Sequence, residues 1–127
     1  MKINHIAIWT HDLEKLKDFY VSYFEGKSNE RYENPKKGFE SYFIYFSSGT
    51  SLELMKSIKL KKLDQQELAP GYAHMAFSLG DKETVDQLTE KLVADGFEKI
   101  NGPRTTGDGY YESVIKDPDG NLVELTI

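Results

Sequence analysis

The chain has 127 residues, 39% hydrophobic and 29% charged, which predicts one globular domain rather than a disordered segment. Its net charge of −5 argues against nucleic acid as the main partner, because phosphate binding needs a basic surface. The absence of cysteine excludes disulfides, thiolate metal ligands and a cysteine nucleophile. No apolar run is long enough to span a membrane and no signal peptide is recognisable, so we expect a cytoplasmic protein with no membrane partner.

The first half of the chain alternates between strand and helix patterns. His5 and Trp9 share one face of the first expected strand, and the aliphatic opposite face is expected to pack beneath a helix. Aspartate is a favoured helix N-cap and glycine a favoured C-terminal stop. The first half is therefore expected to contain a strand at 2–10, a helix between Asp12 and Gly26, and strands at 39–46 and 51–55.

The second half repeats this pattern. A glycine-rich stretch at 101–109, which contains Pro103 and Arg104, is expected to be a loop. The sequence from Asp117 to Gly120, DPDG, is a strong turn signal before the final strand. The second half is thus expected to contain a strand at 72–79, a helix between Asp81 and Gly96, and strands at 110–116 and 122–127.

The two halves are copies of one module, at an offset that drifts only from 69 to 71 residues. The corresponding pairs include His5 with His74, Asp12 with Asp81, Gly49 with Gly120, and Glu53 with Glu124. Each copy is small enough to be marginal alone. We therefore expect a single domain over residues 1–127, built of modules 1–56 and 72–127 joined by a connector at 57–71.

Each module carries one histidine on its first strand and one glutamate on its last strand. Glu53 alternates with two leucines and Glu124 with Val123 and Leu125, so both carboxylates are expected on the face away from the helix. If the first and last strands of a module are neighbours, each module presents one imidazole beside one carboxylate. His11 has no counterpart in the repeat and is interpreted as a surface residue.

Two such pairs supply two nitrogen and two oxygen donors, a set that suits a divalent metal. Zinc, nickel or cobalt are the expected ions, with iron or manganese as alternatives, because these donors accept several first-row metals. A buried carboxylate also needs a positive partner, which a metal ion provides. The alternative is that the histidines belong to the core and the glutamates face solvent. Four residues at corresponding positions of a repeat favour the metal site.

The sequence resembles the vicinal-oxygen-chelate superfamily, which contains glyoxalase I, fosfomycin-resistance thiol transferases, extradiol dioxygenases and bleomycin-binding proteins. The resemblance rests on INHIAIWTHDLEKLKDFY, on GYAHMAFSL and on GPRTTGDGYYESVIKDPDGNLVEL, of which the DPDGN turn followed by VEL is the most specific part. It implies an α+β fold of two paired βαβββ modules whose mixed sheets curl around a metal cavity. It also implies a homodimer and a small-molecule substrate.

Transferred residue by residue, the resemblance implies that the metal ligands are His5, Glu53, His74 and Glu124. This set is similar to that of glyoxalase I, a lyase that converts the hemithioacetal of a 2-oxoaldehyde into a thioester. Glu124 would then be the catalytic base, with Glu53 as the alternative. Glutathione-using relatives tend to carry an arginine where this chain has Trp9, which argues against glutathione as the thiol.

The expected substrate-binding residues are Trp9, Tyr45 and Arg104, the last for an anionic group of the substrate. Two other functions stay open. One is a thiol transferase of the fosfomycin-resistance type, which the shortage of arginine argues against. The other is a non-catalytic protein that binds a flat antibiotic in an aromatic groove of Trp9, Tyr42 and Tyr45, which the intact ligand set argues against. An extradiol dioxygenase fits less well, because such chains are usually longer.

Overall fold

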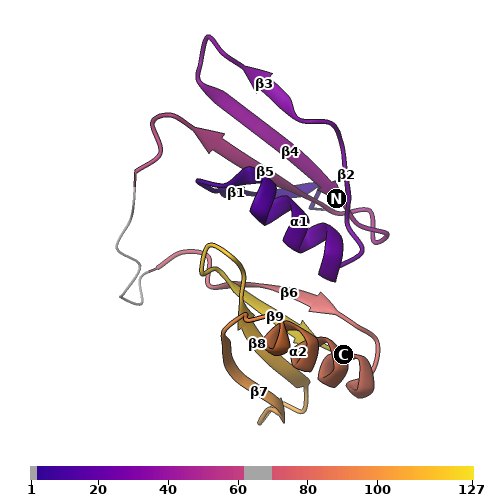
Figure 1. Ribbon diagram of the computed structural model, residues 1–127. Helices are drawn as coiled ribbons and strands as arrows, with labels where there is room; N and C mark the ends of the chain where they lie inside the picture. Colours follow the sequence, from indigo (N-terminus) through magenta and orange to yellow (C-terminus); the bar gives the residue numbers. More distant parts are fainter. Residues whose placement is uncertain (1–2, 62–69) are drawn as a thin grey trace. The chain divides into compact units, whose positions relative to one another are not determined.

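The computed structural model describes residues 3–61 and 70–127. The chain divides into two compact units between residues 67 and 68, and each unit has one helix on one face of its own sheet (Figure 1). This arrangement confirms the α+β class. Of the expected connector, residues 62–69 lie outside the described part, and the preceding strand continues through Ser57.

Within residues 3–61, the first unit contains one helix and five strands. Its sheet has the order β1-β5-β4-β2, and β3 pairs with β4 outside this path. The elements are β1 (His5–Trp9), α1 (Leu13–Tyr23), β2 (Lys27–Ser28), β3 (Tyr32–Asn34), β4 (Phe39–Tyr45) and β5 (Ser51–Ser57).

The second unit repeats the plan, with one helix and four strands in residues 70–127. Its sheet has the order β6-β9-β8-β7. The elements are β6 (His74–Ser78), α2 (Lys82–Ala94), β7 (Lys99–Thr105), β8 (Tyr111–Lys116) and β9 (Leu122–Thr126). In both units the first strand runs parallel to the last one and pairs with it directly, which is the neighbour relation that the sequence analysis required.

The register of the last strands decides which side chains meet the helices. Leu52 and Leu54 are 1% and 0% exposed and lie on the α1 side of β5, while Val123 and Leu125 are both 0% exposed in the second unit. Because neighbours along a strand point to opposite faces, Glu53 and Glu124 lie on the faces that no helix of their own unit covers. These two surfaces are called the open faces below.

The aliphatic side of β1 is less buried than expected. Ile6 lies on the helix side yet is 37% exposed. The reason is its position: β1 is the edge of the described sheet, and α1 packs over β4 and β5 instead. Among residues 3–61, the sheet residues that are fully buried therefore come from the inner strands.

Both helices begin as the sequence predicts. The carboxylate of Asp12 accepts a hydrogen bond from the backbone N–H of Lys15 at 3.1 Å, and that of Asp81 accepts one from Thr84 at 2.8 Å. Such caps satisfy amides of the first turn that have no partner within the helix. Gly96 follows α2 with a φ of 93°, as expected of a glycine that ends a helix.

Gly26 has a different role from the one predicted. The left-handed residue after α1 is Glu25, with a φ of 55°, so Gly26 is not needed there for its backbone conformation. A Cβ atom at Gly26 would instead lie 2.4 Å from Cγ2 of Ile44 and 3.0 Å from the carbonyl oxygen of Tyr20. The glycine is required because the chain passes this closely against β4.

The predicted loop at 101–109 is wrong in its first half, because Lys99–Thr105 forms strand β7. Glycine and proline at positions 102 and 103 gave this segment the appearance of a loop. Proline is tolerated here because β7 is an edge strand of the described sheet, and its pairing with β8 shifts register twice. Arg104 is consequently held on a strand.

Neither of the helices in the described residues is long and apolar enough to cross a membrane.

Candidate metal centre

In the first unit, β1 and β5 bring one histidine and one glutamate together on the open face. Nε2 of His5 lies 3.9 Å from Oε2 of Glu53, a distance suited to charge interaction but too long for a direct hydrogen bond. The parallel register pairs Glu53 with Ala7, two residues after His5 on the same face. The Nδ1 atom of His5 is 2.9 Å from Oδ1 of Asn4, which leaves Nε2 on the side of the carboxylate.

The second unit reproduces this arrangement. Nε2 of His74 lies 3.3 Å from Oε2 of Glu124, and the register again pairs the glutamate with an alanine, Ala76, two residues after the histidine. The two pairs, His5 with Glu53 and His74 with Glu124, are called the half-sites below. Both adjacencies agree with the arrangement that the repeat led us to expect.

The half-sites also agree in their exposure. The glutamate side chains are 18% and 17% exposed, while the histidines are 41% and 45% exposed. Within residues 3–61 and 70–127, no lysine or arginine forms an ion pair with either glutamate. A largely buried carboxylate without a fixed cation is costly, and a metal ion would remove that cost.

The chemistry of the donors fits a divalent metal. Imidazole nitrogen and carboxylate oxygen bind zinc, nickel, cobalt, iron and manganese, and the chain offers no thiolate that would favour a closed structural site. Each half-site supplies two donors. In the described part of the chain, no three histidine, aspartate or glutamate side chains converge on one point.

Comparison with known proteins identifies the family. The profile of the Glyoxalase/Bleomycin resistance protein/Dioxygenase superfamily matches residues 2–125. The chain belongs to this superfamily.

Relatives within the superfamily have different activities. An uncharacterized Bacillus subtilis protein, YqjT, is 28% identical and covers 97% of this chain and 96% of its own length. Lactoylglutathione lyase of Escherichia coli O157:H7 is 25% identical over 98% of this chain and 91% of its own. The metallothiol transferase FosB of Shouchella clausii is 26% identical over 97% of this chain and 77% of its own.

Solved structures agree on the fold. Glyoxalase I from Zea mays superposes with a TM-score of 0.81 at 22% identity, covering 98% of this chain and 44% of the maize chain. At that identity the likeness is one of fold. It confirms the glyoxalase-like architecture that the repeat and the motifs predicted.

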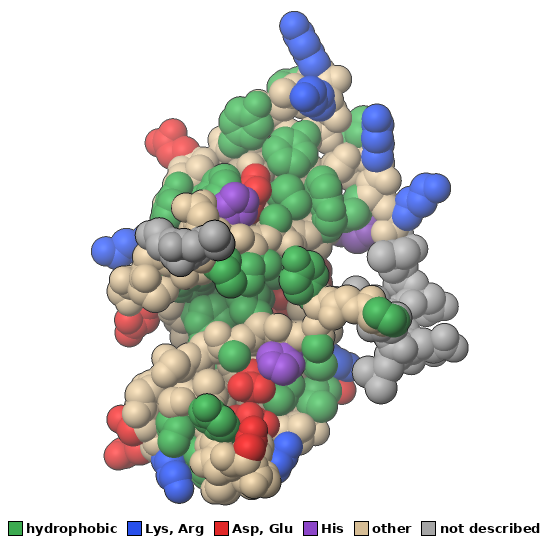
Figure 2. Space-filling view, turned by 180° about the vertical axis from the view of Figure 1, so that it is seen from behind, with side chains coloured by type: hydrophobic (Ala, Val, Ile, Leu, Met, Phe, Trp, Pro, Cys, Tyr) green, Lys and Arg blue, Asp and Glu red, His purple; other side chains and the backbone are tan. Residues whose placement is uncertain are grey.

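Two of the three residues expected to bind substrate lie on the open face of the first unit of this superfamily member. Trp9 is 50% exposed and meets Phe39 edge to face, with ring centres 6.3 Å apart. Tyr45 is also 50% exposed and stacks on Phe43 at 6.2 Å. Figure 2 shows hydrophobic side chains gathered on the face of this unit that is turned away from α1.

The prediction that Tyr42 joins this aromatic face is wrong. The register pairs Tyr42 with Leu54, so its side chain lies on the helix side, where it is 8% exposed. Its hydroxyl donates a hydrogen bond of 2.7 Å to Glu14 of α1, and this bond raises the pKa of Tyr42. The sequence analysis missed Phe43, which pairs with Glu53 in register and contacts the His5 ring at 5.6 Å.

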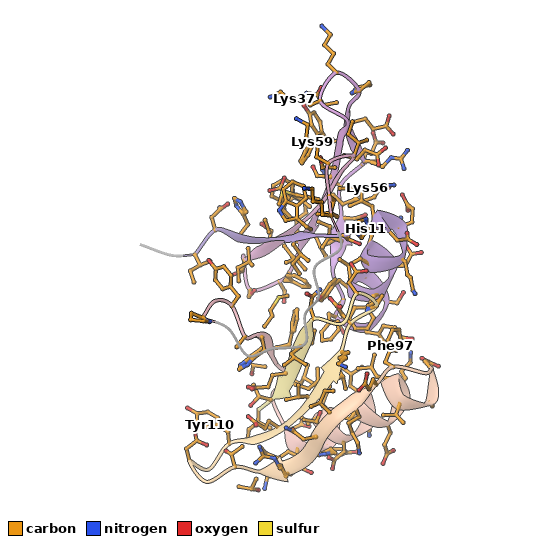
Figure 3. The ribbon with its side chains drawn as sticks, turned by 90° about the vertical axis from the view of Figure 1, so that its left-hand side faces the viewer. His11, Lys37, Lys56, Lys59, Phe97 and Tyr110 are labelled. Carbon is orange, nitrogen blue, oxygen red and sulfur yellow. The ribbon has the colours of Figure 1, made fainter. Side chains whose placement is uncertain are left out.

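Arg104 lies on the open face of the second unit, in register with Glu112. Its Nη2 atom is 3.6 Å from Oε1 of Glu112, whose side chain is 14% exposed. The sequence analysis did not identify Glu112, although alternation from Glu124 and Val114 across β8 could have placed it on this face. Arg104 is thus presented as part of an ion pair. His11 is exposed just before α1 and belongs to no half-site, as expected (Figure 3).

Proposed function

We propose that the chain is a metal-dependent enzyme of the glyoxalase I type, which isomerises the hemithioacetal of a small 2-oxoaldehyde. The observation that carries this proposal is the repeated half-site: the same two residue types, in the same register, on the open face of each unit. The 25% identity with a lactoylglutathione lyase over nearly the whole chain supports it.

The residues that would hold the metal are His5, Glu53, His74 and Glu124. A bound divalent ion would act as a Lewis acid that polarises two neighbouring oxygens of the substrate. The open faces suit this use because their histidines and glutamates remain accessible to a small molecule.

Glu124 is the proposed base. Its carboxylate takes the proton from the hemithioacetal carbon, the electron pair of that C–H bond forms a double bond to the neighbouring carbonyl carbon, and the C=O π pair moves onto the carbonyl oxygen. The same carboxyl then returns the proton to that second carbon, while the hydroxyl of the first carbon gives up its proton as its own C=O bond forms and the oxygen of the second carbon takes up a proton. The product is a thioester, and no atom is gained or lost overall. Glu53, at the corresponding position of the repeat, is the alternative base.

The proposal includes a cytoplasmic homodimer. One chain carries all four donors, so the support for a dimer is that β1 and β6 each pair on one side only within the described sheets. Sedimentation equilibrium of the metal-loaded protein measures its mass and should give that of a dimer. A monomer mass at all protein concentrations would exclude the dimer.

Metal content tests the ligand set. Wild-type protein loaded with zinc, nickel or cobalt and dialysed should retain about one ion per site, and both Glu124→Gln and Glu53→Gln should lose most of it. Glu112→Gln is the matched control, because this carboxylate lies on the same sheet as Glu124 and is similarly buried, at 14% exposed. Equal metal retention by Glu124→Gln and Glu112→Gln would refute the assignment.

Turnover tests the reaction. The loaded enzyme should convert hemithioacetals of methylglyoxal to thioesters, followed by absorbance, with a panel of thiols offered in turn. Glu124→Gln should lose turnover even at metal concentrations that refill the site. Absence of turnover with every thiol would reject the lyase proposal while leaving the metal result intact.

A second candidate is a thiol transferase, favoured by the 26% identity with metallothiol transferase FosB. Such an enzyme joins a thiol to a small electrophile, and an anionic electrophile would need a cation. Arg104 is the candidate for that role, but it already faces Glu112 at 3.6 Å. Consumption of an epoxide phosphonate in the presence of a thiol would decide for this candidate.

A further inference from the structure

The aromatic side chains on the open face of the first unit form a continuous cluster beyond the half-site. The ring of Phe39 lies between Trp9, 6.3 Å away, and Tyr32, 6.2 Å away. Trp9 and Tyr32 are 50% and 52% exposed. Exposed rings in mutual contact offer faces and edges on which another flat ring can pack.

This cluster lies next to the half-site along the strands. Trp9 pairs with Met55, which is two residues beyond Glu53 on the same face of β5. Side chains two residues apart on a strand are about 7 Å apart. A small molecule whose oxygens lie near Glu53 therefore reaches the cluster with its next substituent.

The internal repeat provides a control within the molecule. The residues of the second unit that correspond to Trp9 and Met55 are Ser78 and Thr126, which are paired in the same register. The second unit builds the same sheet with polar side chains at these positions. The aromatic residues of the first unit are consequently not a requirement of the fold, although the half-site residues are the same in both.

A hollow near the β3–β4 connection shares Phe39 with the cluster, although Trp9 and Tyr32 do not line it. Its volume is about 240 Å³, and Asn34, Pro35 and Ile58 also line it. A cavity of about 150 Å³ is large enough for benzene, so this hollow has room for one ring.

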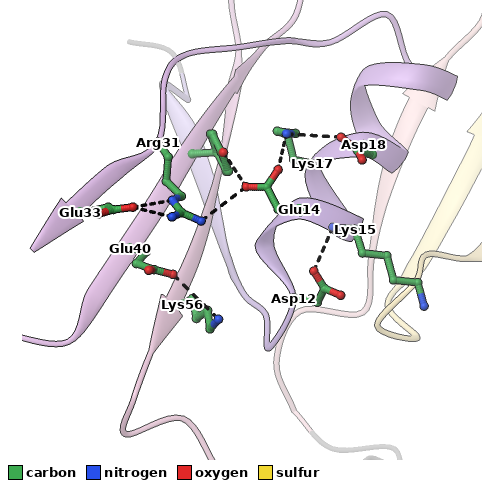
Figure 4. Close-up of polar contacts among 10 residues, drawn as sticks. Asp12, Glu14, Lys15, Lys17, Asp18, Arg31, Glu33, Glu40 and Lys56 are labelled. Carbon is green, nitrogen blue, oxygen red and sulfur yellow. Dashed lines mark hydrogen bonds and ion pairs between the residues drawn. The ribbon is translucent and has the colours of Figure 1, made fainter. Parts of the chain in front are cut away.

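The positions that pair with the cluster on its own face carry no charge, since Trp9 pairs with Met55, Phe39 with Ser57 and Tyr32 with Ser41. The nearest charged residues of these strands alternate to the other face and are paired there: Glu40 lies 3.9 Å from Lys56, and Glu33 accepts a hydrogen bond of 2.7 Å from Arg31 (Figure 4). Charges that are already paired give little extra attraction for an anion or a cation. The surroundings therefore favour an uncharged ligand.

We propose that Trp9, Phe39 and Tyr32 form an aromatic subsite that binds a flat, uncharged ring carried by the substrate. The aromatic subsite names the substrate class of the proposed function: small oxygen-chelating compounds with an aromatic substituent. For the identity of the reaction it rests on that proposed function. A peptide thiol with several carboxylates does not belong to this class.

Binding can be tested without metal, since Trp9 is the single tryptophan of the chain and reports on the subsite directly. Metal-free protein is titrated with phenylacetamide, with cyclohexylacetamide as a non-aromatic match, and with glutathione. Phenylacetamide should change the Trp9 emission saturably and bind about 2- to 12-fold more tightly than cyclohexylacetamide, and glutathione should have no effect. Phe39→Leu should remove this preference.

Tyr110→Leu is the matched control, because the repeat places Tyr110 at the position of Phe39 and its ring is exposed in the second unit (Figure 3). It should bind phenylacetamide as the wild type does. Circular dichroism establishes that both variants are folded. Equal binding of the two amides, or an unchanged preference in Phe39→Leu, would overturn the subsite. So would a dimer in which Trp9 is shielded from acrylamide, because the cluster would then be an interface between copies.

The metal-loaded enzyme supplies the second arm of the test. Hemithioacetals formed with benzyl mercaptan should give a higher kcat/KM than those formed with cyclohexylmethanethiol, and Phe39→Leu should abolish the difference. If no hemithioacetal reacts but phenylacetamide still binds at Trp9, the reaction is refuted and the subsite stands. If all react equally, the reaction stands and the subsite is refuted.

Discussion

Replacing Gly26 with alanine should destabilise the first unit, because the chain passes too closely against β4 to admit a methyl group. The added Cβ would lie 2.4 Å from Cγ2 of Ile44, whereas carbon atoms in contact are separated by about 3.5–4.0 Å. The backbone carbonyl of Tyr20 lies on another side at 3.0 Å. Both neighbouring residues are 0% exposed, so neither can move aside into solvent.

The cost follows from this geometry. Overpacking of a well-packed core usually costs about 1–3 kcal/mol. Alanine also restricts the conformations of the unfolded chain, which stabilises the folded protein by about 0.4–1 kcal/mol when alanine can adopt the native φ. The left-handed residue at this turn is Glu25 rather than Gly26, so this entropic stabilisation applies to Gly26→Ala. The difference between these ranges is about 0–2.6 kcal/mol, and because a separation of 2.4 Å is far inside van der Waals contact, we expect a net loss in its upper part, about 1–2.6 kcal/mol in the free energy of unfolding.

Urea unfolding followed by Trp9 fluorescence measures this loss, since the single tryptophan belongs to the first unit. The control is Gly107→Ala, whose Cβ would have no atom within 4 Å. It should leave the midpoint unchanged or raise it slightly. A Gly26→Ala protein as stable as the wild type, or a loss of equal size in both variants, would refute the close-packing explanation.

Three further predictions concern polar groups. Thr89→Val should lower the free energy of unfolding by about 1–3 kcal/mol, because it leaves the buried hydroxyl of Ser113, 2.6 Å from Thr89 Oγ1, without its partner. Adding Ser113→Ala should recover part of this loss in a double-mutant cycle. The hydrogen bond from the backbone N–H of Thr84 lowers the pKa of the Asp81 carboxyl below its usual 3.8. The stability that this cap contributes is therefore present at neutral pH and is lost as the pH falls through the lowered pKa. In urea unfolding, the greater stability of the wild type over Asp81→Asn should shrink on acidification. Tyr42→Phe removes the hydrogen bond to the half-exposed Glu14 and should lower the free energy of unfolding by about 0.5–1.5 kcal/mol at pH 7. Because that bond raises the pKa of Tyr42, the stability difference between the two proteins should vanish at strongly alkaline pH, and a difference that persists there would contradict this.

The sequence was most informative where the two faces of a strand differ in polarity. Glu53 between two leucines and Glu124 between Val123 and Leu125 could be assigned to a face without coordinates, because burial of the aliphatic neighbours fixes the alternation. That the first and last strands of a module are neighbours was a condition of the prediction, and the parallel pairing of β1 with β5 and of β6 with β9 meets it. The adjacency within each half-site followed from these two facts.

The sequence was ambiguous where both faces of a strand are apolar. Residues 39–46 read FESYFIYF, so alternation alone does not tell whether Tyr42 or Phe43 faces the helix. Only the pairing of Tyr42 with Leu54 decides this, and that pairing depends on tertiary register. Strand β7 was missed for a related reason, since its glycine and proline are tolerated only because it is an edge strand with irregular pairing.

The parallel pairing of the first and last strands of each unit has a consequence for synthesis of the protein. β1 and β6 leave the ribosome before the strands to which they pair, β5 and β9, and the intervening helix and hairpins must form in between. In a nascent chain, the strand that carries the histidine of a half-site therefore stays unpaired until the last strand of that module emerges. Non-local pairing of this kind is slow to form. Premature termination between the histidine and the glutamate of a module would release a product in which that imidazole lacks the carboxylate opposite it.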